Sequence, residues 1–214
     1  MNNLRYLYDE IELMKAGEWS SKYHYSNDNS SYEDLIGLFK ENPRRLYEDM
    51  LKMFENGDWS IEDSIERYYG KKNPSEEMKF SYFKQIFERL FISFENDKFI
   101  PASRVVFVPS LDSLDLKDTG VCWAYHYEGV WEMLEYVDRD TLRVDLYAHI
   151  DKDNIDWKES LYLNLRYPME YEVRALDASK IDVIGYEVIE EETDDVLDFV
   201  GEGIKFRDFN KIKL

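Results

Sequence analysis

Residues 167–176 read YPMEYEVRAL, a stretch in which apolar and charged side chains alternate. A period of two residues is typical of a β-strand with one buried and one polar face, and it predicts a strand over 169–176. Glu170 and Glu172 would then lie on the same face, about 6–7 Å apart. They are either the solvated side of an ordinary strand or a carboxylate pair in a site, and the residue pattern taken alone favours the ordinary strand.

The charge of the chain restricts its partners. The 214 residues carry a formal net charge of -19, from 46 acidic and 27 basic side chains. Residues 101–214 hold 26 acidic and 13 basic side chains, a net -13, whereas residues 1–100 hold 20 and 14, a net -6. Such a chain repels phosphate backbones, so no direct nucleic-acid binding is expected, and a basic protein is the partner that its charge suits.

The single cysteine, Cys122, allows no intramolecular disulfide, which is typical of a reducing compartment. The N-terminal stretch MNNLRYLYDEIELMKAGEW contains acidic residues and does not resemble a signal peptide. The longest apolar runs are too short to span a bilayer. We therefore expect a soluble, cytoplasmic protein without membrane contact.

Motifs for metals, phosphate loops and hydrolytic nucleophiles are missing from the sequence. The three histidines are far apart, and no Cys-x-x-Cys or His-x-x-x-His spacing occurs, so no metal site is expected. Neither a Gly-x-Ser-x-Gly elbow nor a glycine-rich phosphate loop is present. These absences argue against kinases, P-loop enzymes, Rossmann enzymes and serine hydrolases.

The pattern of apolar residues divides the chain into a helical region, 1–100, and a β-rich region, 101–214, which includes an acidic C-terminal segment. Helices followed by strands predict an α+β fold with a mixed or antiparallel sheet. Helices are expected over 3–15 and in segments that begin near Ser30, Pro43, Ser60 and Ser75. Strands are expected over 104–108, 120–127, 141–150, 161–167, 169–176 and 181–189, with a helix over 128–137.

The order of parts over residues 101–189 resembles that of a known enzyme family. A strand that carries Arg104 comes first, then DTG (118–120) leads into the aromatic strand VCWAYHY and a helix, and the strands RVDLYAHI and MEYEV follow. This order is similar to the ADP-ribosyltransferase fold of toxin-type and phage-encoded enzymes, in the class with a Glu-x-Glu motif. The N-terminal helical region would match the helical extension that often precedes that fold. The family's Ser-x-Ser-type motif is missing, because the corresponding stretch, 122–125, reads CWAY.

The resemblance implies NAD as substrate and a role for each of five residues. Glu172 would accept the ribose 2′-hydroxyl and stabilise the cation that develops when the nicotinamide–ribose bond breaks. Glu170 would orient or deprotonate the acceptor, for which a guanidinium is plausible. Arg104 would contact the anionic pyrophosphate or the ribose. Trp123 and Tyr125 would stack on nicotinamide, although aromatic side chains at alternate strand positions are usually part of a core.

A second hypothesis from a different class stays open. The chain would then be a non-enzymatic inhibitor or binding protein whose acidic C-terminal half docks a basic partner. The acidic run over 187–198 would in that case act as a partner surface or imitate a nucleic-acid backbone.

Overall fold

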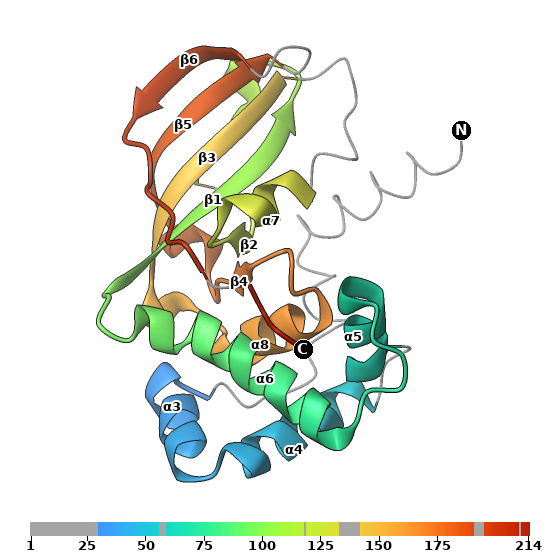
Figure 1. Ribbon diagram of the computed structural model, residues 1–214. Helices are drawn as coiled ribbons and strands as arrows, with labels where there is room; N and C mark the ends of the chain where they lie inside the picture. The colour runs from blue at the N-terminus through green and yellow to red at the C-terminus, as the bar shows by residue number, and fades with distance from the viewer. Residues whose placement is uncertain (1–29, 56–58, 118, 133–141, 191–194, 210) are drawn as a thin grey trace.

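An antiparallel sheet stands on a layer of helices in the computed structural model, which describes residues 30–55, 59–117, 119–132, 142–190, 195–209 and 211–214 (Figure 1). The predicted α+β class, with the helices towards the N-terminus, is confirmed. The helix expected over 3–15 lies outside these residues. The helical region and the sheet share one buried core, and β1 already begins at Phe99.

The helices that precede the sheet in the chain begin at polar N-cap residues. They are α3 (Tyr32–Glu41), α4 (Pro43–Phe54), α5 (Ile61–Tyr69) and α6 (Glu76–Leu90). The Ser60 and Ser75 hydroxyls accept from backbone N–H groups three residues later, as the sequence predicts for those two starts. At α3 the capping box is formed by Ser31 and Asp34, one residue later than expected.

The sheet has six antiparallel strands in the order β4-β2-β1-β3-β5-β6. The central strands β1 and β3 pair along their whole length, whereas β2 meets β1 only at Ser103 and Ala124. Strand β2 then pairs with β4, so that β1, β2 and β4 lie side by side. The strands are β1 (Phe99–Val108), β2 (Cys122–Ala124), β3 (Leu142–Asp151), β4 (Glu172–Arg174), β5 (Asp182–Glu190) and β6 (Asp195–Gly201).

Several expected strands differ from the structure, and the one expected over 120–127 shortens to β2. The stretch 161–167 was expected to be a strand, and this is wrong: it belongs to helix α8 (Trp157–Arg166). Trp157, Leu161 and Leu165 recur every four residues and are all buried, so the helical period prevails over the apparent alternation. The strand expected over 169–176 shortens to β4, and of the helix expected over 128–137 the structure describes only α7 (Tyr127–Glu132).

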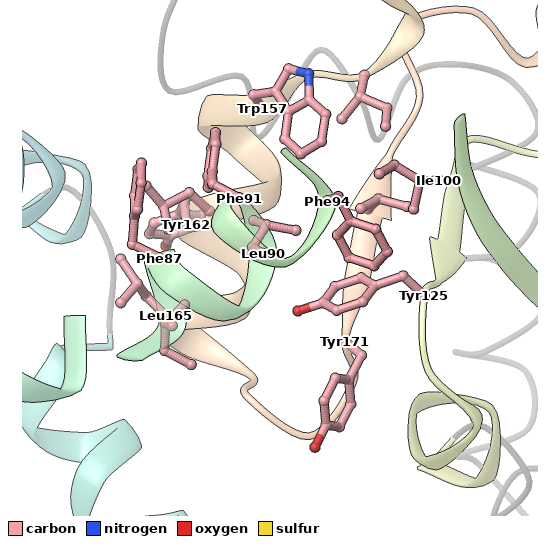
Figure 2. Close-up of a cluster of buried hydrophobic side chains, with 14 of the residues drawn as sticks. Phe87, Leu90, Phe91, Phe94, Ile100, Tyr125, Trp157, Tyr162, Leu165 and Tyr171 are labelled. Atoms are coloured by element: carbon pink, nitrogen blue, oxygen red, sulfur yellow. The ribbon is translucent and has the colours of Figure 1, made fainter. Parts of the chain in front are cut away.

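An aromatic core joins α6 and α8 to the sheet (Figure 2). The rings of Phe87 and Phe91 stack with centroids 4.2 Å apart, and Phe94 meets Tyr125 edge-to-face at 5.7 Å. This packing fixes α8 beside β4, the strand that carries the expected catalytic residue. The labelled members of the cluster are Phe87, Leu90, Phe91, Phe94, Ile100, Tyr125, Trp157, Tyr162, Leu165 and Tyr171.

Candidate active site

Residues of β1, β2, α7 and the segment that enters β4 line a small hollow. Figure 1 shows β2 and α7 beside β1. The hollow brings together Arg104, Glu170 and Glu172, three of the five residues selected from the sequence, and Trp123 forms part of its wall. Its volume is about 50 Å³. The lining consists of Ser103, Arg104, Val105, Cys122, Trp123, Ala124, Gly129, Glu170 and Glu172.

Glu172 opens β4 and pairs across the sheet with Ala124. Part of the residue reaches solvent, but its carboxyl lies in a dry environment beside the Cys122 thiol. Burial raises the pKa of the Glu172 carboxyl, while the thiol and two guanidinium groups, those of Arg174 and Arg104, oppose the rise. The Cys122 thiol has a raised pKa as well, chiefly through burial and then through the neighbouring carboxyl.

Glu170 lies in the turn before β4 and not in the strand itself. Tyr171, between the two glutamates, has φ +48°, in the left-handed region that side chains other than glycine rarely adopt. This backbone conformation breaks the alternation that the sequence suggests, so the expected strand geometry for the pair is wrong. Glu170 and Glu172 nevertheless line the same hollow. The turn, and not the alternation of side chains along a strand, brings Glu170 there.

The turn at Tyr171 is held by its ring. The ring lies 4.5 Å from that of His126, and the Arg89 guanidinium sits 4.2 Å above its centre. Its hydroxyl donates to the Glu128 carboxylate of α7 at 3.0 Å. The ring of Phe209, near the C-terminus, stacks with that of Tyr171 at a centroid distance of 6.2 Å. These contacts offset the strain of the left-handed residue and hold the turn that contains Glu170 in place.

Arg104 reaches from β1 beneath β2. Its guanidinium donates to the Cys122 carbonyl, and it passes so close to Gly120 that a Cβ there would lie 3.0 Å from Cζ. Gly120 also has φ +78°, so the backbone conformation favours glycine here, and any other residue would press on the Arg104 guanidinium. The Arg104 Nε is buried and has no hydrogen-bond partner within the described part of the chain. One donor of this guanidinium is therefore still unsatisfied beside the hollow.

Trp123 and Tyr125 are core residues in this structure, with 1 % and 0 % of their surfaces exposed. The Trp123 indole N–H donates to the Gly120 carbonyl at 3.1 Å, and the Tyr125 hydroxyl donates to Asn164 Oδ1 at 2.8 Å. Tyr125 lies outside the lining of the hollow. Neither ring offers an open face on which a nicotinamide could stack.

Helix α8 supplies residues that the sequence reasoning missed. Asn164 donates to the backbone carbonyl of Glu172, and the Ser160 hydroxyl accepts from Arg174 N at 2.9 Å. Glu159 is buried, and burial raises its pKa to about 7, partly opposed by Arg174. Asp156 caps this helix by accepting from Glu159 N. The Asp-x-x-Glu spacing at 156–159 is a helix-start signal that could have revealed α8.

Gly129 lets α7 approach the Glu170 turn. A Cβ at this position would lie 2.0 Å from the Glu170 carbonyl oxygen and 3.0 Å from the Ala124 Cβ. Only a glycine allows the helix and the turn to touch, and their contact closes one side of the hollow.

Among the described residues, no group of three or more His, Cys, Asp or Glu could hold a metal ion. The same part of the chain contains no helix that is both long and apolar enough to span a bilayer. No family model, no curated protein and no solved structure matches this chain. What the site can do must therefore be argued from its own chemistry.

Proposed function

We propose that the protein is an NAD-dependent ADP-ribosyltransferase that modifies a protein or small-molecule acceptor. One observation supports this above all others: Arg104, Glu170 and Glu172 line a single hollow although they come from segments far apart in the chain. The reaction needs a guanidinium from one strand, a carboxylate from another strand and a carboxylate from the turn before it to face the same dinucleotide. Adjacent strands β1, β2 and β4 bring these groups together.

The chemistry follows from charge. When the bond between nicotinamide and ribose breaks, nicotinamide leaves with the bonding electrons and the ribose carbon becomes positive. Ionised Glu172, held in a dry site, stabilises that carbon and accepts a hydrogen bond from the ribose 2′-hydroxyl. Because the pKa of Glu172 is raised, the ionised fraction and the rate both increase as the pH rises through that pKa.

Glu170 has a different role in this proposal. The acceptor nitrogen forms the new bond to the ribose carbon and must lose a proton, which Glu170 takes. A guanidinium acceptor holds its proton strongly, so a carboxylate beside it is required for transfer. Hydrolysis of NAD depends less on Glu170, because water and not a guanidinium is then the acceptor.

The hollow is too small to hold NAD without a change of shape. A volume of about 50 Å³ holds no more than a few water molecules, whereas ligand pockets usually measure about 300–1,000 Å³. NAD binding therefore requires α7 and the Glu170 turn to separate. The Arg104 Nε and the Glu172 carboxyl supply suitable polar partners once the site has widened.

The test compares Glu172→Gln with Glu170→Gln in the full-length chain. Glu172→Gln should lose NAD hydrolysis and transfer alike, by about 10²-fold or more, since it removes the charge that stabilises the cation. Glu170→Gln should keep NAD hydrolysis and lose transfer to a small guanidine such as agmatine. Normal NAD turnover by Glu172→Gln, with unchanged melting temperatures, would refute the assignment.

A second candidate function is a non-enzymatic binding or inhibitor protein for a basic partner. The observation that favours it is the net charge of -19, concentrated in the C-terminal half. This function predicts a complex that weakens with salt and no change in melting temperature at millimolar NAD.

A further inference from the structure

Strand β6 forms one edge of the sheet and is unusually apolar for an exposed edge (Figure 1). Within the described part of the chain it pairs on one side only, with β5. An exposed, apolar edge strand is a template on which another extended chain can add. The exposed side chains and their exposed fractions are Val196 (53 %), Leu197 (58 %), Phe199 (46 %) and Val200 (44 %).

The apolar side chains lie on both faces of β6. The pairing with β5 skips Leu197, which forms a bulge, so Val196 and Phe199 share one face of the sheet and Asp198 and Val200 share the other. A chain added along the edge would cover apolar side chains on both faces, whereas a partner docked on one face would leave those of the other face exposed. The distribution therefore favours addition of a strand over packing of a helix on the sheet.

Carboxylates accompany these side chains. Asp198 is exposed in the middle of β6, and its Oδ1 accepts from the backbone N–H of Phe199 at 2.9 Å. Without a partner, the backbone N–H of Phe199 at the edge of the sheet is thus bound by the Asp198 carboxylate. A lysine or arginine opposite Asp198 would attract the carboxylate and free the amide for a backbone hydrogen bond. Across the sheet, Glu187 of β5 pairs with Phe199 and adds a second carboxylate at this edge.

We propose that β6 binds an extended segment of a partner protein in which apolar residues alternate with lysine or arginine. The segment adds as a further antiparallel or parallel strand beside Asp195–Gly201. A second copy of this chain is the wrong occupant, because pairing two β6 strands brings Asp198 near like charge and joins two molecules of net charge -19. The surface lies at the opposite end of the sheet from β4, and the inference rests on neither function proposed above.

The test uses the full-length chain and a fluorescent peptide of alternating lysine and valine, with binding followed by anisotropy. The peptide should bind, and Phe199→Ser should weaken binding about tenfold, since it removes an apolar contact on one face. Leu176→Ser, which alters an exposed leucine just after β4 at the opposite edge of the sheet, should bind like the wild type. Raising the salt from about 50 mM to about 500 mM should weaken binding, and a matched peptide of glutamate and valine should not bind.

Asp198→Asn provides a second variant that should keep the fold, because the side chain is exposed. It should bind the lysine peptide more weakly and with less dependence on salt. Equal binding by wild type, Phe199→Ser and Asp198→Asn would overturn the proposal. So would the absence of binding, or equal binding of a peptide whose alternate amides are N-methylated. A wild-type dimer that Phe199→Ser converts to a monomer would show that a second copy occupies the edge and would also overturn it.

Discussion

At the scale of single residues, burial outweighs the neighbouring guanidinium groups and raises the pKa of two carboxyls. Glu172 lies in the hollow, and Glu159 lies behind β4 with only 5 % of its surface exposed. The pKa of Glu159 is raised to about 7, first by burial and further by the charges of Asp156 and Glu172, with Arg174 acting in the opposite direction. The fold therefore disfavours ionised Glu159 at neutral pH.

Glu159→Gln should stabilise the protein in alkaline solution. The folded pKa of about 7 exceeds the ordinary value of 4.5, so the wild type loses stability as the pH rises from about 4.5 through 7. Gln carries no charge to bury, and at pH 8 the variant should gain up to about 3 kcal/mol, with little gain at pH 4. Urea unfolding at both pH values measures the difference. The exposed Glu48→Gln is the control and should change little; a Glu159→Gln chain that is equally stable at every pH relative to wild type would contradict this account.

Gly129→Ala should destabilise the chain by about 1–3 kcal/mol, because its methyl group would collide with the Glu170 carbonyl and separate α7 from the turn. Gly37→Ala is the matched control in α3, where nothing lies within 4 Å of the added methyl group. That variant should gain about 0.5–1 kcal/mol through helix propensity. Thermal unfolding followed by circular dichroism distinguishes the two, and equal effects at both sites would be inconsistent with the close approach described above.

At the scale of elements, α8 determines where β4 lies. Asn164 is fully buried and makes four hydrogen bonds: it accepts from Tyr125 and Arg89 and donates to the carbonyls of Ser160 and Glu172. The Asn164 side chain therefore links β4 to Tyr125 in the core and to the Arg89 guanidinium. A buried polar network of this kind is costly to leave half satisfied.

Asn164→Leu should cost about 3 kcal/mol or more, since several buried polar groups lose their partner at once. Tyr125→Phe removes only one of these hydrogen bonds and should cost about 1 kcal/mol. Urea denaturation of the two variants provides the comparison. If Asn164→Leu were no more harmful than Tyr125→Phe, α8 would not hold β4 in the way proposed.

The elements also show what the sequence could predict. Helices with a local start signal, such as those after Ser60 and Ser75, were predictable because the cap and the apolar period lie within a few residues of each other. Helix α8 was mistaken for a strand because its apolar residues fit both periods, and the local feature that distinguishes them is the start signal at Asp156 and Glu159. The turn at Tyr171 depends on contacts with Arg89, His126 and Phe209 from distant segments, which no local pattern contains.

At the scale of the whole molecule, the strand order decides which residues meet. Arg104, Glu170 and Glu172 share a hollow only because β2 lies between β1 and β4. Their residue types could be selected from the sequence, but their convergence depends on the pairing of β1 with β2 and of β2 with β4, which joins residues as distant as Ala124 and Glu172, and the chain carries no local signal for it. The same order places the apolar edge β6 at the far end of the sheet, so a partner bound there would leave the hollow open.

The most direct test of the central claim is a thermal-shift titration of Glu172→Gln with NAD. This variant should bind NAD without consuming it, because glutamine keeps the shape of the site and Arg104 keeps its unsatisfied donor. At a concentration tenfold above the dissociation constant, binding should stabilise the chain by about 1.4 kcal/mol and raise the melting temperature accordingly. An unchanged melting temperature at millimolar NAD, in both this variant and the wild type, would contradict the account.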